Sequence, residues 1–184
     1  MKKIFIPALI ACSFLFSSCE DVEYDYVVHE LAYEIVPAWQ KISNFQLEMK
    51  DAELRNIKWI NMPGESEEKT KQVAFVNDTY PKLKKDLQDF FKAQSSIDRK
   101  GIDSLFIVCD QQIAIYKDVM RQLSSIAEYN DPMIMLPLQS VVLDNDGECT
   151  LLSRNIDNML KGLSQRYEGK MRDKKDQLVK FESK

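Results

Sequence analysis

The stretch "IDSLFIVCDQQIAIYKDVMRQLSSIA" (Ile102 to Ala127) decides the fold. Its apolar residues return every three or four positions, which is the spacing that places side chains on one face of an α-helix. Further apolar residues beside this stripe make the face broad enough for the centre of a helical bundle. The stripe consists of Ile102, Phe106, Cys109, Ile113, Tyr116, Met120, Leu123 and Ala127, and Leu105, Val119 and Ile126 widen it.

Three other segments carry the same helical spacing. The first is expected either to be kinked at Pro37 or to follow a short lead-in and begin near Val36, because proline suits a first helical turn. Its apolar stripe consists of Leu31, Ile35, Ala38, Ile42, Phe45, Met49 and Ala52. The second covers residues 65–94 and is expected to be kinked but continuous at Pro81. The last begins near Thr150. With only five glycines in 184 residues, the chain predicts an all-α fold, a bundle of about four long helices.

A long apolar crossover segment separates the third and fourth of these helices. It covers residues 131–149 and is too long for a simple turn. Because Pro137 opposes a regular helix, residues 133–143 are expected to form an extended segment across the bundle. Such a segment either completes the core or serves as a binding loop. The candidate binding residues are Met133, Ile134, Met135, Leu136 and Leu138.

The N-terminal region has the layout of a secretory signal. Residues 1–3 form a short cationic head, and residues 4–16 form an apolar stretch that is shorter than the about 20 residues of a membrane span. Two small serines then precede Cys19. Residues 1–19 resemble a bacterial lipoprotein signal, although Phe16 stands where such signals usually carry Leu, Val or Ile. The resemblance implies cleavage before Cys19 and attachment of a diacylglycerol to its thiol.

Cys12 is the competing attachment site, because "LIAC" (Leu9 to Cys12) matches the lipoprotein pattern more closely by residue type. Cleavage there would leave a short apolar region interrupted by Pro7 and would keep the apolar residues 14–16 on the mature protein. Cys19 is therefore preferred. An ordinary secretory signal and an uncleaved anchor are the remaining alternatives.

Cleavage before Cys19 removes two lysines and no acid, which takes the formal net charge from −4 to −6. An exported anionic protein is a poor candidate for binding nucleic acid. Residues 1–18 are thus expected to be the signal, residues 19–27 an acidic tether, and residues 28–184 a single helical-bundle domain. The tether either holds the domain off anionic lipid or, as in the surface-export signals that it resembles, directs the protein to the outer surface of the outer membrane.

The sequence excludes many kinds of chemistry. His29 is the only histidine, and "HELAY" has Tyr33 where a zinc protease needs its second histidine. We nominate no catalytic residue, metal or cofactor. Cys109 and Cys149 either form a disulfide, because the compartment is oxidising, or remain free in the core.

These observations favour a lipid-anchored binding protein of the cell envelope over an enzyme. Its expected partners are the membrane, through the N-terminal lipid, and a protein, peptide or glycan at the envelope. The alternatives are a structural spacer in an envelope assembly and, less favoured, an enzyme that uses carboxylates.

Overall fold

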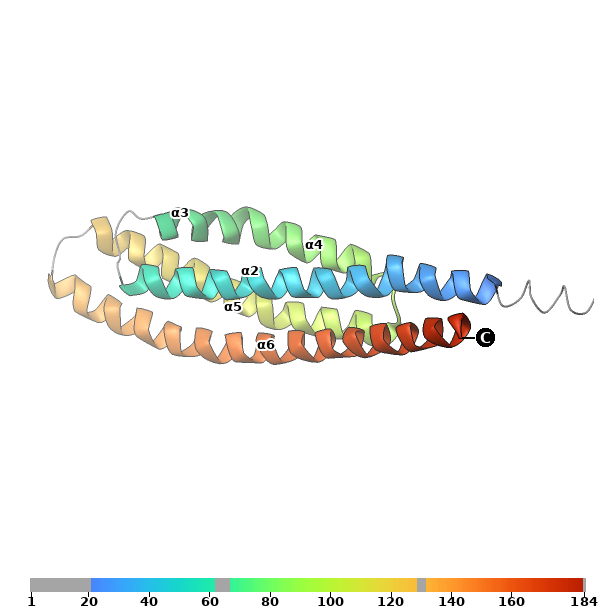
Figure 1. Ribbon diagram of the computed structural model, residues 1–184. Coiled ribbons are helices and arrows are strands. Elements are labelled where there is room, and N and C mark those ends of the chain that lie inside the picture. The colour runs from blue at the N-terminus through green and yellow to red at the C-terminus, as the bar shows by residue number, and fades with distance from the viewer. Residues whose placement is uncertain (1–20, 62–66, 129–131, 184) are drawn as a thin grey trace, which may run out of the picture. The chain divides into compact units, whose positions relative to one another are not determined.

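The computed structural model describes residues 21–61, 67–128 and 132–183 (Figure 1). Every described residue is helical apart from a turn at residues 92–95 and the last described residue. The predicted all-α fold with four long helices is confirmed. The helical elements are η1 (Leu31–Ile35), α2 (Val36–Asn61), α3 (Glu67–Ala74), η2 (Phe75–Thr79), α4 (Tyr80–Phe91), α5 (Ser96–Glu128) and α6 (Pro132–Glu182), where η marks a π-helical turn.

The chain divides into two compact units. Among the described residues, unit 1 comprises 21–40 and 165–183, and unit 2 comprises 41–164. Two helices, α2 and α6, contribute residues to both units. Apolar periodicity shows which face of a helix is buried, but it does not show where along the helix its partners change.

Side-chain pairs give the directions of the helices in unit 2. Lys41 on α2 forms an ion pair with Asp86 on α4, and Lys58 on α2 lies 4.0 Å from Glu68 on α3. A later residue of α2 therefore pairs with an earlier residue of the α3–α4 segment, which shows that the two run antiparallel.

Helix α5 runs parallel to α2. The ring centroids of Phe45 and Phe106 are 5.6 Å apart, with the rings edge to face. Further along both helices, Trp59 packs with Val119 and Leu123 in one buried cluster. Residue numbers therefore rise together on α2 and α5.

Helix α6 runs antiparallel to α5. The side-chain amide of Gln112 donates a hydrogen bond to Ser153, whereas Gly101 lies opposite Leu163. The approach at Gly101 is close, since a Cβ there would lie 3.4 Å from the Leu163 Cδ2 atom. Unit 2 is therefore an up-and-down bundle of four helical segments, in which neighbours in sequence run antiparallel.

The stripes read from the sequence are the buried faces of the helices. Nearly all of the expected positions in the first and third stripes with described side chains are buried. They are Ile35, Ala38, Ile42, Phe45, Met49 and Ala52 in the first, and Ile102, Phe106, Cys109, Ile113, Tyr116 and Leu123 in the third.

A π-helical turn precedes each of the two prolines at which a kink was considered. The N–H of Val36 donates to the carbonyl of Leu31, five residues back, and Pro37 follows. The N–H of Tyr80 likewise donates to Phe75, and Pro81 follows. Because proline lacks an N–H and its ring clashes with the carbonyl four residues back, a wider turn lets the helix pass the proline without ending. The continuity at Pro81 is confirmed. At Pro37 the chain is also helical without a break, and α2 follows the π-helical turn η1 directly at Val36.

The expected extended structure of the crossover segment and the expected start of the last helix are both wrong. The crossover segment, including Met133, Ile134, Met135, Leu136 and Leu138, is helical, and α6 begins at Pro132 rather than near Thr150. Proline is favoured in a first helical turn, and Pro137 removes only one hydrogen bond from a helix of 51 residues.

Helix α5 also begins earlier than the sequence indicated, at Ser96. The Ser95 hydroxyl accepts a hydrogen bond from the backbone N–H of Asp98 at 3.3 Å and donates to its carboxylate at 2.8 Å. This reciprocal cap resembles a capping box and satisfies an N–H that would otherwise lack a partner.

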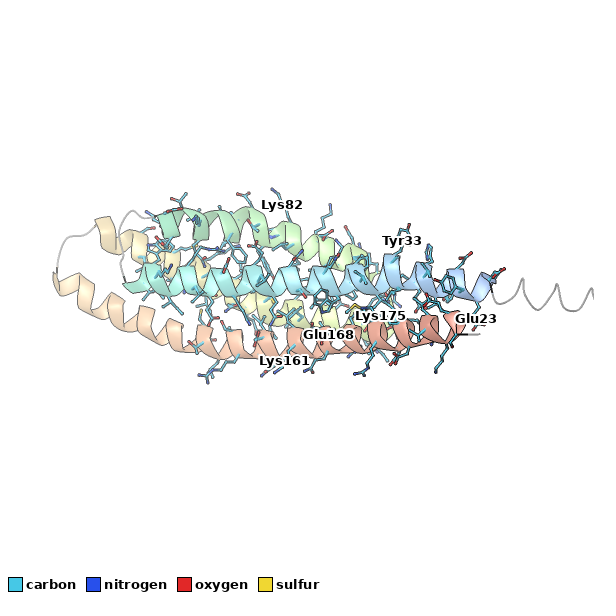
Figure 2. The ribbon with its side chains drawn as sticks, in the orientation of Figure 1. Glu23, Tyr33, Lys82, Lys161, Glu168 and Lys175 are labelled. Atoms are coloured by element: carbon cyan, nitrogen blue, oxygen red, sulfur yellow. The ribbon has the colours of Figure 1, made fainter. Side chains whose placement is uncertain are left out.

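Unit 1 pairs residues 21–40 with residues 165–183 in antiparallel order. The Tyr24 and Phe181 rings meet edge to face, and the Lys174 ammonium lies 2.6 Å from the Glu30 carboxylate. The Trp39 indole N–H donates to Glu168, labelled in Figure 2, at 3.2 Å. Residues 21–27, which were expected to belong to a solvated tether, are therefore helical, and Val27 among them is buried.

Candidate functional site

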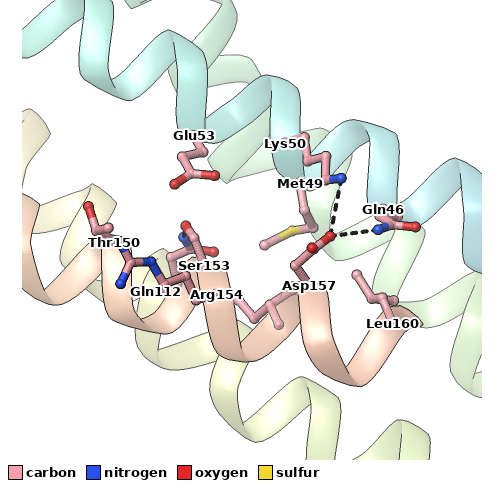
Figure 3. A pocket seen from close by; sticks show the side chains of 11 residues that line it. Gln46, Met49, Lys50, Glu53, Gln112, Thr150, Ser153, Arg154, Asp157 and Leu160 are labelled. Carbon is pink, nitrogen blue, oxygen red and sulfur yellow. Dashed lines mark hydrogen bonds and ion pairs between the residues drawn. The ribbon is translucent and has the colours of Figure 1, made fainter. Parts of the chain in front are cut away.

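A hollow of about 200 Å³ lies among α2, α5 and α6 within unit 2 (Figure 3). Its floor is apolar and is formed by Met49, Ile156 and Leu160. Charged and polar side chains surround the floor. The lining residues, which define the hollow below, are Gln46, Met49, Lys50, Glu53, Gln112, Thr150, Ser153, Arg154, Ile156, Asp157 and Leu160.

One side of the hollow is an internally paired group. The Gln46 side-chain amide donates to Asp157 at 2.6 Å, and the Lys50 ammonium lies 3.2 Å from the same carboxylate. The hydrogen bond from Gln46 and the hydrogen bond and charge of Lys50 lower the pKa of Asp157. Asp157 is therefore ionised at neutral pH, and its charge is already balanced.

The other side of the hollow carries two opposite charges. Glu53 is half-buried on α2, and its carboxylate extends toward α6 above Ser153 (Figure 3). Arg154 is exposed on α6. Neither side chain forms an ion pair or a hydrogen bond with the residues that the structure describes. This half of the hollow thus offers one anion and one cation to a ligand.

Buried hydrogen-bonding groups lie behind Glu53. Gln112 is only 1% exposed and donates to Ser153, and both line the hollow. Tyr116 is fully buried beside Ser153, and its hydroxyl has no well-formed hydrogen bond. Burial raises the pKa of Tyr116 well above its usual value, and the nearby Glu53 carboxylate adds to this effect. The Tyr116 hydroxyl therefore stays protonated and neutral.

The arrangement suits binding better than bond breaking. A nucleophile needs an adjacent base, and Ser153 instead accepts a hydrogen bond from an amide. Asp157 has a lowered pKa, whereas a general acid needs a raised one. An apolar floor with charged groups at its edge is typical of sites that bind small molecules.

A second, larger hollow of about 370 Å³ lies between the η2–α4 segment and α5. The Tyr80 hydroxyl and the Lys84 ammonium both donate to Asp110 there, each at 2.6 Å. Burial and the hydrogen bond to Asp110 raise the pKa of Tyr80. The polar groups on this side are satisfied by one another, so the first hollow is the stronger candidate.

The candidate residues named from the sequence do not form this site. Cys19 lies outside the described residues, as do the side chains of residues 133–138, which belong to α6. His29 is exposed, and its ring packs against the Tyr33 ring at a tilt of 36°, with centroids 4.6 Å apart.

The lining residues of the hollow were missed, although they leave a signal in the sequence. Gln46, Lys50 and Glu53 border the apolar stripe of α2 at helical spacing, and Thr150, Ser153 and Asp157 do so on α6. Such polar borders are usual on amphipathic helices. Only the packing of α2 beside α6 shows that the polar border of one helix and the polar border of the other line the same hollow.

Cys109 and Cys149 are both buried and free, and the helix register explains why. The pairs Gln112–Ser153 and Gly101–Leu163 place Cys109 opposite residue 156, seven residues beyond Cys149. At 1.5 Å per residue the two are offset by about 10 Å along the bundle, beyond the roughly 7 Å limit between the Cα atoms of a disulfide.

We predict that Cys109 and Cys149 remain thiols in the folded protein. Burial raises the pKa of Cys109 to about 12, so its thiol should be unreactive while the bundle is folded. Maleimide labelling followed by mass spectrometry should find no label on either residue in native protein and full labelling after denaturation without a reductant. A peptide that joins the two cysteines would contradict the register.

Comparison with protein-family models, with curated proteins and with solved structures finds no match for this chain. Over residues 21–61, 67–128 and 132–183, no helix combines the length and apolar character of a membrane span. Within those same ranges, no group of three or more His, Cys, Asp or Glu residues lies close enough to hold a metal ion.

Proposed function

We propose that the protein is a lipid-anchored binding protein of the cell envelope, anchored to the outer membrane through Cys19. The lipoprotein-like residues 1–19 support export and anchoring. The hollow supports binding, and its residues Glu53 and Arg154 carry the proposal, because two opposite charges at the edge of an apolar floor lack partners among the described residues. The ligand is a protein segment, a peptide or a glycan.

The difference between the two sides of the hollow explains why binding is favoured over a purely structural role. Asp157 is held by Gln46 and Lys50, which connects α2 to α6 and keeps that edge of the hollow in place. A spacer would need only such connections between helices. It would have no use for charged side chains left without partners beside buried hydrogen-bonding groups.

Anchoring is tested by expressing the full chain in a bacterium fed with an alkyne-labelled fatty acid. We expect the label on the protein, loss of the label in Cys19→Ser, and normal labelling in Cys12→Ser. Mass spectrometry should find acylated Cys19 as the mature N-terminus. Labelling that survives Cys19→Ser and disappears in Cys12→Ser would place the anchor at the competing site, and no labelling at all would remove the anchor from the proposal.

Binding is tested on the chain from residue 19 onward with Cys19→Ser. Thermal shift and calorimetry with a panel of amino acids, short peptides and oligosaccharides should find at least one class of ligand. Gln46→Trp, which fills the hollow from its partly exposed edge, should abolish that binding. Binding that is unchanged in Gln46→Trp, or the absence of any binding, would contradict the assignment of the hollow.

A further inference from the structure

We infer that the hollow binds a small zwitterion, a molecule that carries an ammonium group and a carboxylate group on a short apolar body. This inference rests on the proposed binding function and replaces the ligand classes given there, a protein segment, a peptide or a glycan, with a class defined by its two charges. An α-amino acid and a short peptide with free ends both have this chemistry.

The ammonium group is assigned to the Glu53 side of the hollow. The half-buried Glu53 carboxylate forms no ion pair with a cation among the described residues. It lies close enough to the buried Tyr116 hydroxyl to raise the pKa of that group. Ser153 and Thr150 add hydroxyl oxygens to the same lining. An ammonium group has three N–H donors and no acceptor, so it matches one carboxylate accompanied by hydroxyl acceptors.

The carboxylate group is assigned to Arg154 at the exposed edge. A guanidinium donates two parallel hydrogen bonds to a carboxylate, and Arg154 forms no ion pair with a described residue. Lys50, the other cation of the lining, is already paired with Asp157 and competes less for the ligand. The two unpaired charges stand on different helices, α2 and α6, so a ligand with both charges would bridge them.

The apolar floor and the volume of the hollow determine the polarity and the size of the part of the ligand between its two charged groups. Met49, Ile156 and Leu160 offer apolar contact between the two charged groups. A volume of about 200 Å³ accommodates an amino acid with an aliphatic side chain. A long polymer would extend beyond the hollow, and only one end of it would contact the lining residues.

Calorimetry with leucine and its analogues tests the inference. Leucinamide lacks the carboxylate, and 4-methylpentanoate lacks the ammonium group. Because a hydrogen-bonded charge contributes strongly to binding, each analogue should bind about ten-fold more weakly than leucine or more weakly still. The affinities of leucyl-leucine and trileucine are measured in the same way. If either peptide binds more tightly than leucine, the ligand is a peptide rather than a free amino acid.

Two substitutions should each remove one part of this selectivity. Glu53→Gln should weaken leucine about ten-fold while leaving 4-methylpentanoate unchanged, and Arg154→Gln should weaken leucine similarly while leaving leucinamide unchanged. The matched controls are Asp51→Asn, an exposed acid two residues from Glu53, and Lys82→Gln, an exposed cation on α4 (Figure 2). Both controls should bind leucine as the parent protein does.

The outcomes separate this inference from the proposed function. If an oligosaccharide binds, Gln46→Trp abolishes that binding, and leucine and the peptides do not bind, the binding function stands and the zwitterion is wrong. Equal binding of leucine and leucinamide, or unchanged leucine binding in Glu53→Gln, would also overturn the inference. If no member of either panel binds, both proposals fail.

Discussion

Replacement of Gln72 by methionine is expected to stabilise the protein. The Gln72 side chain on α3 is 0% exposed, and neither its amide nitrogen nor its amide oxygen has a hydrogen-bond partner. A buried polar atom without a partner costs about 1 to 3 kcal/mol, and methionine has a similar shape without the polar atoms. Gln72→Met should therefore raise the free energy of unfolding by about 1 to 3 kcal/mol, measured by urea denaturation.

Gln112→Met is the matched control, because it makes the same substitution at an equally buried glutamine that has a partner. Its amide donates to Ser153, so its loss should lower the free energy of unfolding by about 1 to 2 kcal/mol. The two variants should thus change stability in opposite directions. Destabilisation by Gln72→Met would show that its amide is hydrogen-bonded in solution, for example through an internal water molecule.

Phe45→Ala is expected to be the most damaging single substitution in the core of unit 2. Phe45 is fully buried on α2, with its ring edge to face against Phe106 and 6.4 Å from the ring of Tyr80. It therefore joins α2 to both α4 and α5. Removing a buried phenylalanine side chain costs about 3 to 5 kcal/mol, because apolar burial is lost and a cavity remains.

Leu47→Ala provides the comparison at a position two residues away on the same helix. Leu47 is 64% exposed, so its truncation should change the free energy of unfolding by less than about 0.5 kcal/mol. Urea denaturation followed by circular dichroism measures both variants. Equal effects of the two substitutions would mean that α2 does not bury the face that carries Phe45.

Much of the fold could be predicted because burial of one helical face leaves a direct pattern in the sequence. Ile102 and Phe106 lie four residues apart in a stripe, and both are buried. The boundaries were harder, because they depend on local contacts. Ser95 gives α5 an early start through one cap, and Pro132 can begin a helix as readily as it ends one.

The candidate site could not be predicted, because it depends on which helices are neighbours. Glu53 and Arg154 are about 100 residues apart in the chain, and each is an ordinary polar residue at the border of an apolar stripe. The burial of Gln72 could not be predicted either, since a glutamine next to the apolar Val73 looks like a solvent-facing residue. Its burial follows from the positions of α2 and α5 around the α3–η2 segment, which periodicity alone does not supply.

The π-helical turn before Pro81 has a consequence for how this chain can change over evolution. A residue added to a regular α-helix rotates everything after it by about 100°, which would turn the apolar face of α4 away from the core. The wider turn at η2 accommodates one extra residue, so Tyr80, Leu87 and Phe91 remain buried after it. The single-residue insertion and the proline can therefore be gained or lost together while the bundle keeps its register.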